Sequence, residues 1–249
     1  KLIIEKEGEV DYLTLNRPNE LNTLDDALML ELREYFGNLY FDHSVRIVVL
    51  RGAGKAFCAG LDLKSVQADK DPGEALKTQR KISEIILRMR RCPQPIVSVI
   101  QGAACGGGFA LALASDIRLA TDKAKMNAAF IKIGLSGCDV GVSYLLPRLV
   151  GSSVASELIL TGRFIDADRA LKTGLVSTVV PAEQLPFEVK SLVDDMLAGS
   201  ALGLRLTKEG LNVNIDANSL EGAIAMEDRN QVLCTQSGEF ARSVNSFLR

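Results

Sequence analysis

Two stretches of the chain repeat one local pattern, in which a short apolar strand runs into a glycine-bearing turn. They are RIVVLRGAGKAFCAG at Arg46–Gly60 and PIVSVIQGAACGGG at Pro95–Gly108. Their β-branched runs have the composition of strands that are buried on both faces. Helical patterns accompany them, at Pro72–Arg91 and Gly106–Ala114. This alternation of strands and helices predicts an α/β body with parallel strands.

The rest of the chain predicts a hairpin at its start and mostly helices towards its end. The short apolar runs Leu2–Lys6 and Val10–Leu15 are typical of a hairpin. Asn22 or Thr23 is expected to cap a helix that runs to about Tyr40. Strands are also expected at Asp116–Ala120 and Leu175–Val180, and helices at Val142–Leu146, Val154–Leu160, Ala167–Lys172, Ala182–Ala198, Ala201–Val213, Leu220–Cys234 and Glu239–Phe247.

The chain is long enough for one large domain, or for a body with a small appendage. Its 249 residues compare with the ~150 residues of a common domain. No Pro- or Ser-rich linker separates its halves. We therefore predict a body over residues 1–195 and a helical C-terminal region over residues 196–249, which packs on the body or on a neighbouring subunit.

Composition and charge exclude several classes of protein. The chain has 29 Lys and Arg residues against 31 Asp and Glu, and 47% of it is hydrophobic. Such a chain is too apolar for a disordered protein and not basic enough to bind nucleic acid through bulk charge. Its longest uncharged stretch, Cys92–Ser115, contains Pro93, Pro95 and three consecutive glycines, so we do not expect a membrane helix. No signal peptide is visible, and a cytoplasmic location is expected.

Cysteine and histidine are too few or too scattered for several kinds of site. The only histidine is His43, which we expect at the surface, so neither a Ser-His-Asp triad nor a polyhistidine metal site is predicted. The cysteines are odd in number and form no C-x-x-C pair, which argues against disulfides and structural zinc and for a reducing compartment. They are Cys58, Cys92, Cys105, Cys138 and Cys234.

The glycine turns suit a ligand oxygen that carries negative charge. Glycine lets main-chain N–H groups approach a ligand, and a helix that begins at Gly106–Gly108 points its free N–H groups the same way. The turn Ala59–Leu63 also precedes a helical-looking stretch, so one donor from each turn would form an oxyanion hole. Alternatively, the glycines only allow tight packing of strand on helix. Neither turn has the pattern of a P-loop or a dinucleotide-binding loop.

The turns lie within longer motifs, which come in a set order along the chain. The motifs are KAFCAGLDL at Lys55–Leu63, the run Pro95–Gly108 with Ser115–Arg118, LNRP at Leu15–Pro18 with Leu21–Asn22, and LTG at Leu160–Gly162 with Gly174–Val176. In this order they resemble the enoyl-CoA hydratase/isomerase (crotonase) family over nearly the whole chain.

The resemblance implies a crotonase-like spiral of ββα repeats with a helical C-terminal region that serves trimerisation. It implies a homotrimer or a dimer of trimers, and an acyl-CoA thioester substrate of fatty acid metabolism. Coenzyme A then arrives as part of the substrate, and neither a separate cofactor nor a metal is expected. By the same resemblance, the thioester oxygen is held by the N–H groups of Leu61 and Gly107. The residues that match the substrate and CoA site are Ala59, Gly60, Leu61, Asp62, Leu63, Gly106 and Gly107.

The chain departs from the family's hydratases at the groups that transfer protons. Their two glutamates correspond to Ala110 and Phe130, neither of which transfers a proton. The best remaining carboxylate is Asp139, in an Asp-Val-Gly context that resembles the family's double-bond isomerases. Asp139 is predicted as the general acid and base, or alternatively as the N-cap of the helix that follows.

Other polar residues near these motifs receive weaker predictions. Asp62 and Asp116 are expected to be structural, and Cys105 and Cys138 to be small apolar filler beside the pocket. Candidates for contacts with the CoA phosphates, or for ordinary solvated charge, are Arg17, Lys55 and Lys64. The wall of the acyl pocket is expected to come from Val66–Pro72 and Phe130–Val142.

These features together predict an acyl-CoA enzyme that shifts an enoyl-CoA double bond by proton transfer through Asp139. One carboxylate suffices to move a proton between two carbons, whereas activating water usually enlists a second group. Hydration of 2-enoyl-CoA through Asp139 is the close alternative. The same oxyanion hole would also suit thioester hydrolysis or decarboxylation. A further alternative is a protein that binds CoA thioesters without catalysis.

Overall fold

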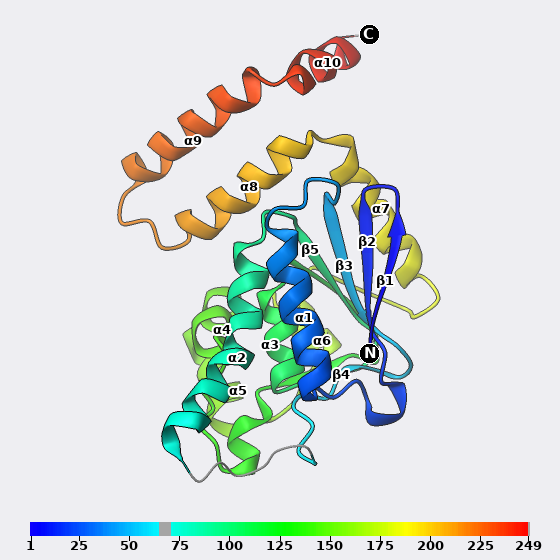
Figure 1. The fold of residues 1–249 in the computed structure, drawn as a ribbon, viewed down its shortest axis with the longest axis vertical. Coiled ribbons are helices and arrows are strands. Elements are labelled where there is room, and N and C mark those ends of the chain that lie inside the picture. The colour runs from blue at the N-terminus through cyan, green and yellow to red at the C-terminus, as the bar shows by residue number, and fades with distance from the viewer. Residues whose placement is uncertain (65–70, 249) are drawn as a thin grey trace.

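A computed structural model describes residues 1–64 and 71–248 (Figure 1). Its larger sheet has six strands, in which β1 and β2 form an antiparallel hairpin and every later neighbour pairs in parallel. The predicted parallel α/β body is thereby confirmed. In spatial order the strands are β1 (Leu2–Glu7), β2 (Val10–Leu15), β3 (Ile47–Gly52), β5 (Ile96–Ile100), β7 (Ile117–Thr121) and β10 (Thr178–Val180).

A second, smaller sheet is built from very short strands. Strands β4, β6 and β8 pair in parallel, and β9 closes the edge antiparallel to β8. β4 follows β3, β6 follows β5 and β8 follows β7, and a helix comes after each pair, so the chain repeats a ββα unit. The short strands are β4 (Ala56–Cys58), β6 (Ala103–Cys105), β8 (Lys125–Asn127) and β9 (Ile165–Asp166).

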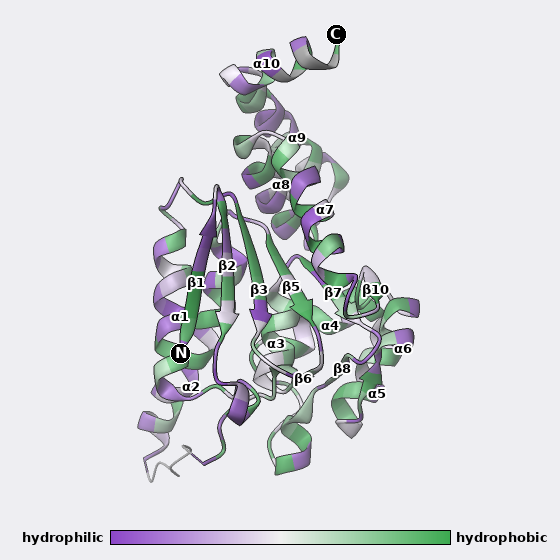
Figure 2. Ribbon diagram, turned by 90° about the vertical axis from the view of Figure 1, so that its right-hand side faces the viewer, coloured by the Kyte–Doolittle hydropathy of each residue, from purple (hydrophilic) through white to green (hydrophobic). Residues whose placement is uncertain are grey.

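The helices of the body surround α3, which is buried over almost its whole length because it consists of small and apolar residues. Figure 2 shows β5, in front of this helix, in hydrophobic colours. The body helices are α1 (Asp26–Leu39), α2 (Pro72–Arg91), α3 (Gly107–Ala114), α4 (Val142–Val150), α5 (Ser152–Thr161) and α6 (Ala167–Lys172), with 3-10 turns η1 (Pro18–Glu20) and η2 (Ala129–Ile133).

The predicted cap of α1 was wrong. Asp25 caps the helix by accepting a hydrogen bond from the N–H of Leu28 at 2.9 Å. Asn22 is instead fully buried, with φ +56°, and its side chain donates to the carbonyl oxygens of Ala53 and Ala56. The asparagine therefore ties the first glycine turn to the body rather than starting a helix.

The C-terminal helices divide into one that covers the sheet and three that leave the body. Leu185, Val189 and Val193 of α7 pack against residues of β2, β3 and β5. The other three form an arm that extends away from the body (Figure 1). The predicted boundary after residue 195 falls inside the last turn of α7. The helices are α7 (Leu185–Ala198), α8 (Ala201–Asn214), α9 (Leu220–Thr235) and α10 (Gly238–Phe247).

None of the helices in the described part of the chain combines the length and the apolar character that a membrane crossing requires.

Candidate active site

The two glycine turns meet because the strands before them are neighbours in the smaller sheet. β4 and β6 run in parallel, so the turns that follow them leave the same edge. Gly60 has φ +95°, and a Cβ on it would lie 2.7 Å from the carbonyl oxygen of Cys105 and 3.5 Å from the nitrogen of Gly107. Only glycine permits this approach without displacement of the second turn.

In the described part of the chain, the N–H groups of Leu61 and Gly107 donate in none of the backbone hydrogen bonds around the two turns. Leu24 donates to the oxygen of Gly60 at 2.8 Å, and Asp62 donates to the oxygen of Leu24 at 3.0 Å, so the N–H of Leu61 takes no part in this bridge. Gly107 is the first residue of α3, and its N–H has no acceptor within the helix. A Cβ on Gly107 would lie 4.0 Å from the nitrogen of Leu61. The second turn at Gly107 thus lies against the nitrogen of Leu61, as a site with one donor from each turn requires.

The stretch that directly follows the first turn, residues 65–70, lies outside the described residues. Leu61 forms an isolated bridge with Leu24, and Leu63 and Lys64 lie in a turn. The next described helix, α2, begins at Pro72. The bridge to Leu24 therefore fixes the backbone of the first turn at Leu61.

Asp139 lies in the turn before α4, and its carboxylate does not cap that helix. The residue at the cap position is Gly141, with no side-chain hydrogen bond. Oδ1 of Asp139 instead accepts hydrogen bonds from Gln79 Nε2 at 2.6 Å and from the N–H of Val140 at 2.8 Å. Burial raises the pKa of this carboxyl above its ordinary value, and the two hydrogen bonds limit the rise. A half-buried carboxyl with a raised pKa has the properties of a proton-transferring group.

The two positions that carry glutamates in the family's hydratases are apolar and buried here. Ala110 lies within α3 and is fully buried, and Phe130 of η2 is 7% exposed. The ring of Phe130 lies beside the second turn, since a Cβ on Gly106 would be 3.7 Å from its Cε1 atom. A buried aromatic ring therefore lies beside the second turn, at a position where the family's hydratases carry a carboxylate.

Asp62 forms an ion pair with Arg17, which also lies near a second carboxylate. Arg17 Nη2 lies 2.9 Å from Asp62 Oδ2 and 3.4 Å from Asp25 Oδ2. The hydrogen bond from Arg17 holds the pKa of Asp62 below its ordinary value, so Asp62 stays ionised in this pair. Lys55 and Lys64 are exposed beside the first turn, whereas Arg17 is mostly buried.

The remaining residues of the predicted site occupy the first turn. Ala59 donates its N–H to the oxygen of Leu21 at 3.0 Å, and the side chain of Leu63 is 56% exposed. Part of the predicted pocket wall, residues 66–70, lies outside the described residues. The other part, 130–142, contains η2 and the turn that carries Asp139.

The cysteines near the turns have unequal surroundings. Burial raises the pKa of the Cys58 thiol to about 12 and also raises that of Cys105. These thiols are poor nucleophiles at neutral pH, in agreement with the filler role expected of Cys105. Cys138 is exposed, so the same expectation was wrong for it. His43 is exposed, as predicted.

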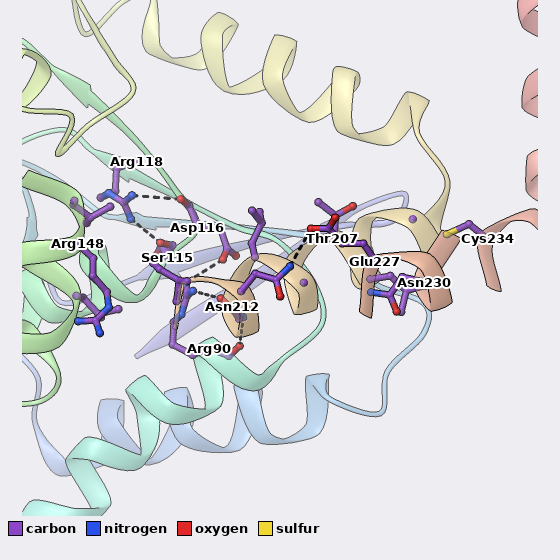
Figure 3. Close-up of a pocket in the computed structure, with 18 of the residues that line it drawn as sticks. Arg90, Ser115, Asp116, Arg118, Arg148, Thr207, Asn212, Glu227, Asn230 and Cys234 are labelled. Atoms are coloured by element: carbon purple, nitrogen blue, oxygen red, sulfur yellow. Dashed lines mark hydrogen bonds and ion pairs between the residues drawn. The ribbon is translucent and has the colours of Figure 1, made fainter. Parts of the chain in front are cut away.

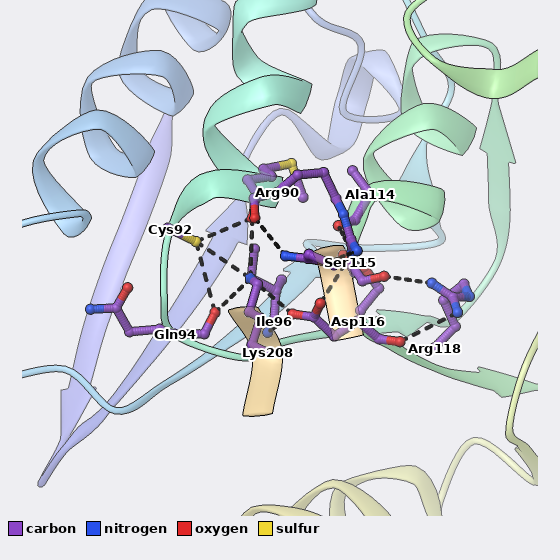
Figure 4. Close-up of polar contacts among 12 residues, drawn as sticks. Arg90, Cys92, Gln94, Ile96, Ala114, Ser115, Asp116, Arg118 and Lys208 are labelled. Atoms are coloured by element: carbon purple, nitrogen blue, oxygen red, sulfur yellow. Dashed lines mark hydrogen bonds and ion pairs between the residues drawn. The ribbon is translucent and has the colours of Figure 1, made fainter. Parts of the chain in front are cut away.

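Asp116 joins the body to the arm (Figure 4). Its Oδ2 accepts from the N–H of Ile96 at 2.8 Å and pairs with Lys208 Nζ at 2.9 Å, while Oδ1 pairs with Arg90 at 3.1 Å. Lys208 belongs to α8, is 4% exposed, and donates also to the oxygen of Gln94 at 2.8 Å. Asp116 is structural, as expected. Sequence reasoning missed Lys208, because a lysine in an amphipathic helix is normally solvated.

A cleft of about 810 Å³ separates the arm from the body, and the predicted site residues do not line it (Figure 3). Its walls come from the ends of α2, α3 and α4 and from α8 and α9. Arg90 contacts both Asp116 and Asn212 on its inner side. The cleft is thus a junction between elements rather than part of the glycine-turn site.

Comparison with known proteins assigns the architecture and the site to a family. The family model described as enoyl-CoA hydratase/isomerase matches residues 5–249. The chain belongs to the enoyl-CoA hydratase/isomerase family and has its crotonase fold.

Relatives within the family carry two kinds of name. A protein of Mycobacterium bovis named probable enoyl-CoA hydratase echA12 is 40% identical over 93% of this chain and 83% of its own length. The 1,2-epoxyphenylacetyl-CoA isomerase of Escherichia coli is 33% identical over 97% and 93%. A solved structure of a monofunctional enoyl-CoA isomerase from M. smegmatis superposes with a TM-score of 0.76, at 38% identity over 90% and 97%. These names include both hydratases and isomerases, so the relatives define the family and are shared between the two reactions.

Proposed function

We propose that this protein shifts the double bond of an enoyl-CoA thioester, with Asp139 as the base and then the acid. Leu61 and Gly107 are the donors to the thioester oxygen in this proposal. The observation that carries it is the burial of apolar Ala110 and Phe130, which leaves Asp139 as the candidate carboxylate. The names of the E. coli and M. smegmatis relatives are in line with an isomerase.

The proposed reaction needs one proton and no other reactant. Asp139 removes a proton from the α-carbon of a 3-enoyl thioester, and the electron pair of the broken C–H bond moves towards the carbonyl, making an enolate. The N–H groups of Leu61 and Gly107 stabilise the negative oxygen, each by ~3 kcal/mol in comparable sites. The enolate then collapses, the double bond moves to the α and β carbons, and Asp139 returns the proton to the γ-carbon.

The substitution Asp139→Asn tests this role. The amide is nearly the same size but accepts no proton, so turnover of 3-enoyl-CoA should fall at least ~100-fold, the lower range for loss of a general acid–base. Binding of a non-reactive acyl-CoA should change little, as titration calorimetry would measure. Unchanged turnover on both 3-enoyl- and 2-enoyl-CoA would remove Asp139 from the mechanism.

Hydration of 2-enoyl-CoA is the second candidate, favoured by the name of the M. bovis relative. It adds the mass of water to the substrate, whereas isomerisation leaves the mass unchanged, so mass spectrometry of the products separates the two reactions. Saturable binding of acyl-CoA with no product at any chain length would instead favour a binding protein without catalysis.

We also propose that the arm of α8, α9 and α10 forms a homotrimer or a dimer of trimers. Support comes from its exposed apolar side chains, such as Leu211 at 69% and Leu220 at 75%. Coenzyme A is proposed as part of the substrate, with no separate cofactor, and the cytoplasm as the location.

A further inference from the structure

The carboxylate of Asp139 is held through one of its two oxygens. Oδ1 accepts both the hydrogen bond from Gln79 Nε2, at 2.6 Å, and that from the N–H of Val140, at 2.8 Å. Oδ2 is the acceptor in neither of these bonds. Two donors on one oxygen fix the plane and the direction of a carboxyl group, which is how a reacting group is prepared for one geometry.

Gln79 reaches this turn from a distant part of the chain. It lies in α2, and it is half-buried although its neighbours in the first two turns of that helix are exposed. Seven residues later on the same face, Ile86 lies against the turn, since a Cβ on Gly141 would be 3.6 Å from its Cγ2 atom. Helix α2 therefore packs along the turn that carries Asp139, and Gln79 is directed into it.

The second donor, the N–H of Val140, belongs to a residue with a strained backbone conformation. Val140 has φ +38°, which is unfavourable for a β-branched residue. Its side chain is 8% exposed and belongs to the main apolar core, so packing maintains this conformation. Strain of this kind commonly persists where it orients a functional group.

We infer that Gln79 is a positioning residue, which holds Oδ1 of Asp139 so that Oδ2 is the oxygen that carries the proton. The inference rests on the proposed role of Asp139. The amide group also favours the ionised carboxylate over the protonated form. Among the described residues, the groups that shift the pKa of Asp139 are Gln79 and Val140, together with burial, and no charged side chain takes part.

The tests are Gln79→Met, which removes the donor at similar length, and Gln79→Glu, which replaces it by a second carboxylate. Asp139 must be ionised to take a proton, so activity is lost as the pH falls through its pKa. Without the donor the pKa of Asp139 rises. The acidic limb of kcat, which is the low-pH side of its pH profile, should therefore move up by about one pH unit for Gln79→Met. It should move further for Gln79→Glu, because like charges disfavour ionisation. We expect kcat at neutral pH to fall about tenfold for Gln79→Met, with KM within about twofold.

Thr78→Val, at an exposed neighbour on α2, is the matched control and should leave kcat and the limb unchanged. If Gln79 served folding alone, both substitutions would lower the unfolding temperature. The acidic limb of kcat would then not move to higher pH in the order wild type, Gln79→Met, Gln79→Glu. If Asp139→Asn is inactive while Gln79→Met keeps the wild-type limb and kcat, this inference is wrong and the proposed function stands. If Asp139→Asn keeps full turnover, both are wrong.

Discussion

At the scale of single residues, the candidate oxyanion hole depends on backbone shape. The donors proposed for it are main-chain N–H groups, and the glycines around them keep Cβ atoms out of a crowded crossing of two turns. Gly60 combines φ +95° with a carbonyl oxygen at 2.7 Å from any added Cβ. Its replacement therefore affects both the fold and the hole.

Gly60→Ala should reduce kcat about 100-fold, because the turn must move and carries the N–H of Leu61 with it. It should also lower the free energy of unfolding by about 1–3 kcal/mol through backbone strain. Gly238→Ala, in an open position at the start of α10, is the control and should be neutral or slightly stabilising. Urea unfolding and steady-state kinetics measure the two effects; wild-type kcat in Gly60→Ala would disprove the role of this turn.

At the scale of elements, one buried lysine fastens the first helix of the arm to the body. Lys208 of α8 contacts the end of α2, the oxygen of Gln94 and the carboxylate of Asp116, which in turn binds the start of β5. A buried charge that loses its partner is costly, since the remaining ion is left without solvent or counter-ion.

Lys208→Met should lower the free energy of unfolding by about 2–4 kcal/mol, because Asp116 then keeps a single cation partner among the described residues, Arg90. Cleavage after Arg205, the trypsin site of α8 that this variant keeps, should become faster, as limited trypsin digestion would measure. The control Lys190→Met removes an exposed lysine that pairs with Asp194 on α7, and its effect should stay within about 0.5 kcal/mol. Adding Asp116→Asn to Lys208→Met should recover part of the loss; a further full loss would contradict the pairing.

At the scale of the whole molecule, the arm exposes apolar side chains that a monomer would leave in water. No side chain of α9 for which burial is described is buried. Leu220 and Ile224 are 75% and 44% exposed on one face of this helix. Contiguous apolar surface of this kind is typical of interfaces between subunits.

Sedimentation velocity should therefore give three or six times the 26.9 kDa of the chain. Leu220→Glu with Ile224→Glu should shift the protein to smaller species, because each charge would have to be buried. Phe187→Glu, at a 76% exposed position on α7, is the control expected to keep the assembly. A monomer at all concentrations in the unchanged protein would contradict the proposed role of the arm.

The long helices could be predicted because their spacing repeats over many residues: the helix at Pro72–Arg91 has the predicted bounds. The short strands β4, β6, β8 and β9 could not, since two or three residues carry no period. From the sequence, Asp139 could serve as the general acid and base or as a helix N-cap, because Asp is common at the N-cap position. The carboxylate instead accepts a hydrogen bond from Gln79, 60 residues away in sequence, and no local pattern reveals such a contact.

The two donors proposed for the thioester oxygen are main-chain groups, and this has a consequence for mutational scanning. A survey that replaces each side chain by alanine would leave the N–H of Leu61 in place at position 61 and would report a tolerant residue. At Gly107 the same survey would add a Cβ 3.0 Å from Leu24 and report a steric defect. Such a map would pass over the chemistry of both residues, and exchange of the amide for an ester in the backbone is the substitution that would reveal it.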